Sequence, residues 1–209
     1  RQAALAALNC DDIMLAAYGN PDLYELSASW SDPTDVQWGT DAGSEYYNQH
    51  DTEKAKELLK EAGYNNEKIV LVTTQDYPEM YNATLVVQEQ LKQAGINAEV
   101  ETYDFSTFME HRSNPQQFDM FITSNSYNML PIQLSVLDSG WAGLNSSEVS
   151  EGIQAIRSAA SDEEAAAAWE KLQKFLYEYS AATVLGHYTG VTAMSNDVAG
   201  YDYLRFPIY

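Results

Sequence analysis

Polar and aromatic side chains follow two apolar runs of this 209-residue chain, residues 69–72 and 118–123, and could bind a small molecule there. The side chains in question are Gln75, Asp76, Tyr77, Ser124, Asn125, Ser126 and Tyr127. Their hydroxyl, amide and carboxylate groups can form hydrogen bonds, and their rings can stack on a solute. Neither group contains an obvious nucleophile beside its base. The two groups therefore predict binding rather than covalent chemistry.

Catalytic and metal-binding patterns are not found in the sequence. It contains no GxGxxG, GxxxxGK[ST], HExxH or GxSxG motif. His50, His111 and His187 are not spaced as metal ligands, and the single Cys10 excludes an internal disulfide and a cysteine-based zinc cluster. We therefore expect no metal and no cofactor. The many carboxylates leave a glycosidase-type pair of acids open, because sequence alone does not give their separation.

The elements that position these side chains are clearest between residues 51 and 104. Asp51 is a good N-cap, and the helix after it has apolar residues at helical spacing and stops at Gly63. A buried strand follows at 69–72, then a helix after Pro78 whose stripe comprises Met80, Ala83, Val87, Leu91 and Ala94. Residues 96–103 alternate apolar and polar side chains, as a half-exposed strand does.

The rest of the chain gives a weaker pattern. We expect helices over residues 1–18, with a break near Asn9–Asp12, over 105–112, and in two segments between 149 and 179. Asp11, Asp12 and Asp104 are interpreted as residues at helix starts. Strands are predicted at 118–123, 183–188 and 191–194, and an extended exit segment at 196–209. Residues 19–50 lack a clear period and predict a packed loop, with Trp30, Trp38, Tyr46 and Tyr47 among its aromatic residues.

Composition and charge narrow the class of protein. Hydrophobic residues make up 45% of the chain, which is ordinary for a globular protein. The net charge of -20 disfavours nucleic acid and anionic membranes as partners, and no apolar run is long enough to span a bilayer. The chain opens at Arg1 directly into helix-like sequence, so we expect it to be a piece of a longer protein.

The order of strands and helices predicts an α/β fold with a central, mostly parallel sheet flanked by helices on both faces. In open sheets of this kind, ligands bind beyond the carboxyl ends of the strands. The residues after 69–72 and after 118–123 meet this condition. The sequence therefore predicts a binding crevice lined by these two polar segments.

Several segments, in order, resemble the extracytoplasmic solute-binding proteins of bacterial ABC importers, family 5, the dipeptide- and oligopeptide-binding type. RQAALAALNCDDIMLAAYG resembles the family's RQAxxxAxDRxxIxxxxxG helix, and DTEKAKELLKEAGY resembles DPxKAKxLLxEAGY. QEQLKQAGINAEVETYDFSTFMEHR is similar to QxxLxxxGIxVxLxxxDWxTFxxxR. FDMFITS and the stretch from LQKFLYEYS to VAGY also match the family's pattern, so that the resemblance covers nearly the whole chain.

The resemblance implies a periplasmic-binding-protein-like lobe. Residues 1–185 would form the C-terminal ligand-binding lobe, and 186–209 a return or hinge segment toward the N-terminal lobe. Phe105 and Arg112 fall at pocket positions of the family, and Ser124 falls where the family often has Trp. Tyr127 falls where peptide binders have an Asp that pairs with the ligand's amine. A buried ammonium needs a carboxylate partner, so this departure argues against a free peptide amino terminus unless Asp76 or the other lobe supplies one.

The resemblance also implies a function and partners. The protein would capture a small solute, a peptide or similar, in a cleft between two lobes and deliver it to the membrane subunits of an ABC importer, without turnover. It would be extracytoplasmic, either periplasmic or a cell-surface lipoprotein. Two alternatives remain open at this point: a carboxylate-dependent hydrolase, and a sensory or adhesive domain that kept the binding-protein fold.

Overall fold

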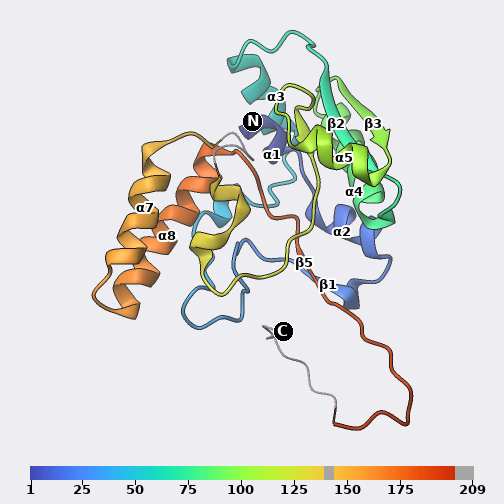
Figure 1. Cartoon of the computed structure of the whole chain (residues 1–209). Coiled ribbons are helices and arrows are strands. Elements are labelled where there is room, and N and C mark those ends of the chain that lie inside the picture. The colour runs from blue at the N-terminus through green and yellow to red at the C-terminus, as the bar shows by residue number, and fades with distance from the viewer. Residues whose placement is uncertain (139–143, 201–209) are drawn as a thin grey trace.

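The computed structural model describes residues 1–138 and 144–200, and Figure 1 shows how its elements are arranged. The helices are α1 (Gln2–Ala6), α2 (Cys10–Tyr18), α3 (Thr52–Glu61), α4 (Pro78–Gln93), α5 (Phe105–Arg112), α7 (Ser147–Ser158) and α8 (Asp162–Tyr179). The strands are β1 (Tyr24–Glu25), β2 (Ile69–Thr74), β3 (Ala98–Tyr103), β4 (Met120–Phe121) and β5 (His187–Tyr188). Short 3-10 helices lie at Pro21–Leu23, Ser44–Tyr46, Pro131–Gln133 and Ser135–Leu137.

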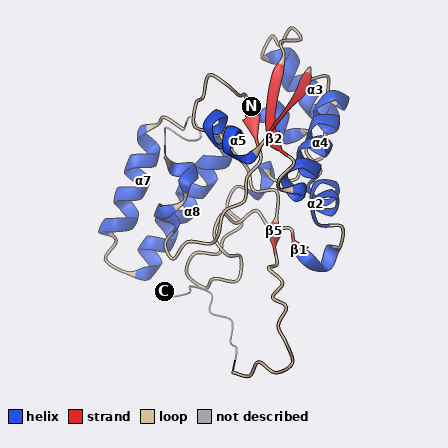
Figure 2. Cartoon of the chain, turned by 45° about the vertical axis from the view of Figure 1, so that its right-hand side comes forward, coloured by secondary structure: helices blue, strands red, loops and turns tan. Residues whose placement is uncertain are grey.

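The central sheet has three parallel strands in the order β3-β2-β4, with β2 in the middle (Figure 2). Leu71 is in register with Val100 of β3 and with Met120 of β4. Successive residues of β2 face opposite sides, so Leu71 packs with α4 whereas Val72 packs with Phe108 of α5. The predicted α/β class, with helices on both faces of a parallel sheet, is confirmed.

Two of the predicted strands are shorter than expected, and one is wrong. The strand expected at 118–123 is only Met120–Phe121, because the carboxylate of Asp119 accepts the hydrogen bond of the Val70 main-chain N–H at 2.7 Å, where a ladder carbonyl would stand. The strand expected at 183–188 is only His187–Tyr188, which pairs antiparallel with β1. Residues 191–194 form no strand: they are exposed, with no neighbouring strand to pair with in the described part of the chain.

The predicted helix starts are largely confirmed. The side chains of Asp51 and Asp104 accept hydrogen bonds from the main-chain N–H groups of Lys54 and Thr107, at 2.9 and 3.1 Å. The break in the first helical segment falls at Asn9, whose side-chain oxygen accepts from the N–H groups of the two aspartates that follow it. Asp11 and Asp12 are therefore first-turn residues of α2, where a negative charge is favoured.

A polar stripe on α8 holds the long loop of residues 26–50 in place. Trp169, Gln173 and Tyr177 are spaced four residues apart and are fully buried. Each donates to a main-chain carbonyl of the loop; the acceptors are Trp38 at 2.9 Å, Thr40 and Ala42 at 3.0 Å, and Ala28 at 2.6 Å. The side-chain oxygen of Gln173 also accepts from the N–H of Trp30. The expected packed loop is thus fixed by hydrogen bonds from one helix face.

The chain leaves the folded body at β5. From Tyr188 to residue 200 every residue is exposed, and the segment projects away from the helices and the sheet as an extended arm (Figures 1 and 2). Val191, Met194 and Val198 are among the large apolar side chains that it exposes. The predicted extended exit begins with a turn at residues 196 and 197, closed by a hydrogen bond from the Val198 N–H to the Ser195 carbonyl at 3.0 Å, and its last residues, 201–209, lie outside the described part.

The hydrogen bonds of Gln173 give a first prediction. Replacing Gln173 with Leu leaves one N–H and two carbonyls of the loop without partners in a buried place, which costs about 3 kcal/mol of unfolding free energy. Urea denaturation followed by far-ultraviolet circular dichroism measures this loss. The control is Gln93→Leu at the exposed end of α4, which we expect to change stability by less than about 0.5 kcal/mol. Equal losses in both variants would contradict the role of Gln173.

Gly43 and Gly63 give a second prediction, because both adopt left-handed backbone conformations in different surroundings. A Cβ on Gly43 would lie 2.7 Å from the Tyr177 ring, whereas a Cβ on Gly63 would meet nothing within 4 Å. Gly63→Ala should cost about 1 kcal/mol from backbone strain alone. Gly43→Ala should cost at least about 3 kcal/mol, since α8 must move as well. Thermal denaturation of both variants tests the difference, and similar melting temperatures would refute the clash.

Candidate functional site

Asp76, Tyr77 and Phe105 come together at the carboxyl edge of the sheet. Thr74 and Tyr103, the last residues of β2 and β3, are in register, so the residues after them emerge side by side. The Asp76 carboxylate accepts a hydrogen bond from the main-chain N–H of Phe105 at 2.7 Å. The rings of Tyr77 and Phe105 lie 4.7 Å apart between centroids, tilted by 56°. The structure thus brings two residues of the first predicted group together with Phe105, a pocket position that the family resemblance implied.

One ring of this aromatic pair is exposed to solvent, and the other is partly buried against the core. Tyr77 is 42% exposed, whereas Phe108, one turn after Phe105, is fully buried and lies 6.2 Å from the Phe105 ring. Phe105 is therefore braced from below while Tyr77 presents its ring to a solute. A tilted aromatic pair with a carboxylate beside it can enclose apolar or planar groups and accept hydrogen bonds from them.

Arg112 lies at the opposite end of α5 from Phe105. Its guanidinium donates to the Thr123 hydroxyl at 2.7 Å and lies over the rings of Phe108 and Phe121, at 5.9 and 5.8 Å from their centroids. Partial burial lowers the pKa of this guanidinium, which still carries its charge at neutral pH. With α5 eight residues long, Arg112 and Phe105 are about 10 Å apart along its axis. The structure does not bring them into one cluster.

The predicted binding residues 124–127, which follow β4, lie in two different surroundings. Ser124, Asn125 and Ser126 are exposed beyond β4, as Gln75 is beyond β2. Tyr127 is partly buried and contacts β5: its hydroxyl is 2.8 Å from Nδ1 of His187, and the two rings are stacked with centroids 5.5 Å apart. Tyr127 therefore contacts β5, the strand at which the chain leaves the body.

His187 is a residue that sequence reasoning did not single out. Burial lowers its pKa, while the nearby carboxylates of Glu25 and Asp32 oppose that shift more weakly. Its Nε2 atom is buried without a hydrogen-bond partner. Tyr127 and His187 are 60 residues apart, and no local pattern indicates such a pair. His111, likewise missed, stacks on Tyr103 with centroids 4.1 Å apart.

The carboxylates of Asp76 and Asp104, which lie at this edge, accept hydrogen bonds from main-chain N–H groups at the start of α5. Asp104 is exposed, and hydrogen bonds from the Thr107 hydroxyl and main-chain N–H lower its pKa, so it stays ionised at neutral pH. A general acid needs a raised pKa, so Asp104 has the opposite property. Within residues 1–138 and 144–200, no three His, Cys, Asp or Glu side chains are grouped as metal ligands.

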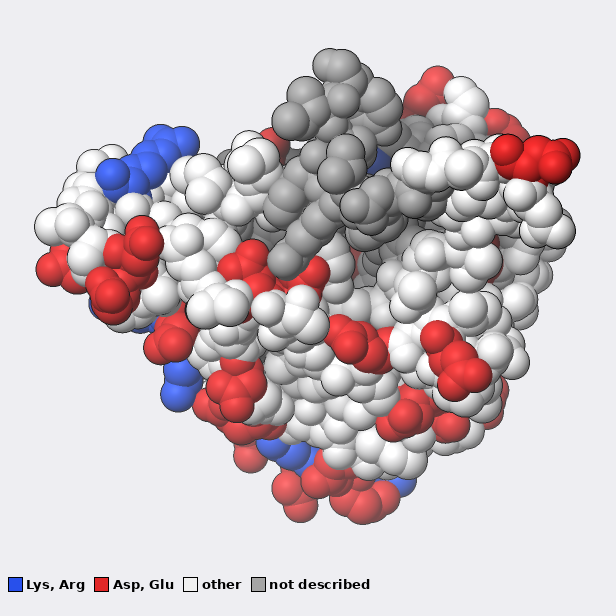
Figure 3. Space-filling model, turned by 90° about the horizontal axis from the view of Figure 1, so that it is seen from below, with Lys and Arg blue, Asp and Glu red and all other residues white. Residues whose placement is uncertain are grey.

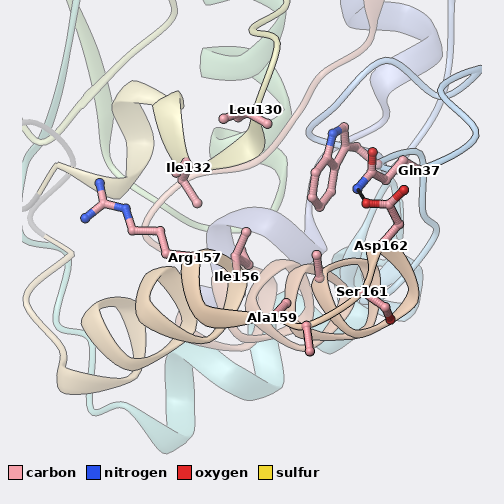
Figure 4. A pocket seen from close by; sticks show the side chains of 11 residues that line it. Gln37, Leu130, Ile132, Ile156, Arg157, Ala159, Ser161 and Asp162 are labelled. Carbon is pink, nitrogen blue, oxygen red and sulfur yellow. Dashed lines mark hydrogen bonds between the residues drawn. The ribbon is translucent and has the colours of Figure 1, made fainter.

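A surface pocket of about 340 Å³ lies elsewhere, at the turn between α7 and α8 (Figure 4). Its walls include Leu130, Ile132 and Ile156. At its rim the side-chain amide of Gln37 donates a hydrogen bond of 3.4 Å to the carboxylate of Asp162. None of the predicted binding residues lines it. Sequence reasoning missed this pocket, since its walls come from three distant segments. The sheet edge, with its exposed aromatic pair, is the better candidate site.

The surface of the protein is strongly acidic. Figure 3 shows far more acidic than basic side chains on the face seen from below, in keeping with the net charge of -20. Such a surface repels nucleic acid phosphates and anionic lipids. No helix in the described part of the chain has the length and apolar composition needed to cross a bilayer.

Known proteins share this sequence pattern and fold. Over 96% of its length the chain is 29% identical to the probable peptide ABC transporter periplasmic-binding protein y4tO of Sinorhizobium fredii, and covers 40% of that protein. The structure superposes on the ABC transporter substrate-binding protein CtaP of Listeria monocytogenes with a TM-score of 0.76 and 20% identity, covering 90% of this chain and 39% of that one.

A third relative has a solved complex. The oligopeptide-binding protein AppA of Bacillus subtilis, in complex with a nonapeptide, matches with a TM-score of 0.72 and 21% identity, covering 89% of this chain and 40% of that one. These likenesses show a periplasmic-binding-protein fold, as predicted. The chain spans about 40% of the length of these relatives. The model of the bacterial extracellular solute-binding proteins, family 5 (middle part), matches residues 1–140. The chain belongs to this family of bacterial extracellular solute-binding proteins.

Proposed function

We propose that this chain forms one lobe of a solute-binding protein that captures a small solute between two lobes and delivers it to an ABC importer. The observation that carries the proposal is the exposed ring of Tyr77 against the partly buried ring of Phe105, with Asp76 beside them, at the carboxyl edge of a parallel sheet. This is the position at which open α/β sheets bind ligands. Ser124, Asn125 and Ser126, exposed beyond the neighbouring strand, extend the same edge.

In this proposal the chain consists of two parts, with the boundary that the family resemblance implied. Residues 1–185 are the ligand-binding lobe, and residues 186–209 return toward the other lobe as a hinge segment. The exposed arm after β5 supports the division, because Val191, Met194 and Val198 are apolar side chains that gain from burial against a second body. The coverage of only about 40% of the relatives agrees with a further lobe that this chain does not contain.

The solute in this proposal is peptide-like, in line with the printed descriptions of two relatives. The Asp76 carboxylate is exposed and uses one oxygen on the N–H of Phe105, so its other oxygen can accept from a solute amine. Arg112 shapes the base of the site rather than its mouth, since it donates to Thr123 and covers two phenylalanine rings. The partners are the importer's membrane subunits, and the location is periplasmic or, as a lipoprotein, the cell surface.

The protein acts by binding without turnover in this proposal. A carboxylate hydrolase needs one acid held protonated, yet Asp104 is stabilised as an anion by Thr107, and Asp76 is bonded to an N–H. Both acids serve the start of α5. The sequence family, whose description names solute binding, supports the same choice.

A lone lobe supplies only part of the contacts, which gives a third prediction. In isothermal titration calorimetry with a nonapeptide and a tripeptide, the 209-residue chain should bind no tighter than about 1 mM, because one open face buries little of a solute. The full-length protein should bind at least one of them in the micromolar range or tighter. Micromolar binding by the isolated chain would show that closure of two lobes is not required.

Tyr77 gives a fourth prediction. In the full-length protein, Tyr77→Ala should weaken peptide binding at least about tenfold, because it removes an exposed ring from the predicted cleft wall. The control is Tyr46→Ala, which removes a ring near α8, away from the sheet edge. Melting temperatures of both variants establish that they are folded. Unchanged affinity of a folded Tyr77→Ala protein would remove the sheet edge as the solute site.

A further inference from the structure

The strand β5 is held on both of its sides by aromatic side chains. His187 and Tyr188 are consecutive, so their side chains point to opposite sides of the strand. His187 stacks on Tyr127 and shares a hydrogen bond of 2.8 Å with its hydroxyl. Tyr188 stacks on Tyr18 at the end of α2, with ring centroids 5.6 Å apart and planes only 11° from parallel. The strand is therefore fixed between α2 and the loop that follows β4.

β5 also holds the chain to the body at the point where its exposed stretch begins. In the ladder with β1, Tyr24 pairs with Tyr188 and Glu25 with His187. The N–H of Thr189 then donates to the carbonyl of Leu23 at 2.7 Å. Every residue from Tyr188 to 200 is exposed. The orientation of β5 consequently sets the direction in which the arm departs.

Polar groups surround His187 on each element packed against it. Glu25 faces it across the ladder, Asp32 and the main-chain groups of Ser27 and Ser29 approach from the loop after β1, and the Tyr127 hydroxyl comes from the loop after β4. Its Nε2 has no hydrogen-bond partner and is buried. The Tyr127 hydroxyl is thus the side-chain group that forms a hydrogen bond with the His187 ring.

We propose that Tyr127 is a positioning residue, whose hydroxyl holds His187 and thereby couples the loop at the sheet edge to the strand that sends the chain toward the other lobe. The proposal rests on the proposed two-lobed function and deepens it. Tyr127 follows Ser124, Asn125 and Ser126, so a solute that shifts this exposed segment also shifts the partner of β5. Solute contact and lobe orientation become linked through one hydrogen bond.

The fifth prediction tests the bond without any solute. Amide hydrogen exchange of Thr189, measured by NMR in the 209-residue chain, should be about fivefold faster in Tyr127→Phe, which keeps the stacked ring but removes the hydroxyl. The Ile69 amide, bonded to Asn97 in the sheet, should exchange at the wild-type rate in the same sample. Tyr46→Phe is the control variant and should leave both amides unchanged.

His187→Phe and the double variant complete a mutant cycle. If the hydrogen bond between Tyr127 and His187 is what protects the Thr189 amide, the double variant should exchange no faster at Thr189 than either single variant. The pH profile separates this role from general packing. Burial lowers the pKa of His187, so the neutral ring is the folded form, and protection at Thr189 should be full above pH 6.5 and fall as the pH drops below it. His187→Phe should lack this fall.

Two results would overturn the coupling: wild-type exchange at Thr189 in Tyr127→Phe, or strictly additive effects in the cycle. Either could occur in a protein that still binds solute, because the exchange measurement contains none. Conversely, failure of the full-length protein to bind peptides leaves the bond between Tyr127 and His187 intact. The two proposals therefore fail separately.

Discussion

The structure depends on the burial of most of β2 between two other strands and two layers of helix. Residues 71–74 of this strand are buried, and its main-chain groups pair with β3 on one side and β4 on the other. A strand enclosed in this way has one orientation and one register, because a shift by one residue would exchange Leu71 with Val72 between two different cores. β2 stays buried up to its last residue, Thr74, and the chain becomes exposed directly after it, at Asp76 and Tyr77.

The helices α7 and α8 form a second body of structure, and a polar stripe of α8 fixes the loop of residues 26–50. α8 buries Leu172 and Leu176 against α7, as an amphipathic helix should, but its other buried stripe consists of Trp169, Gln173 and Tyr177. These donors satisfy carbonyls of a loop that forms no ladder of its own. Because an unpaired buried carbonyl is costly, such a loop can be packed only where side chains replace the missing main-chain partners.

The sequence was sufficient where local periodicity and caps determine the structure. The stripe of α4 and the caps Asp51 and Asp104 are as predicted, and Tyr77 lies just beyond the carboxyl end of β2, where the order of strands put it. It was insufficient where distant residues meet. The sequence did not single out Gln173 and Tyr177 of α8, because their hydrogen-bond partners lie more than a hundred residues away. The pairing of Tyr127 with His187 has the same origin.

The ladder between β1 and β5 joins the beginning of the chain to its end. Tyr24 and Tyr188 are separated by the sheet and by the α7–α8 hairpin, so bringing them together closes a loop that contains nearly the whole body. Closing so long a loop in an unfolded chain is entropically unfavourable for a ladder of only two residue pairs, and becomes favourable once the body between them is compact. The segments before and after the body are therefore brought together by folding itself, and the arm acquires a direction only when the body is already compact.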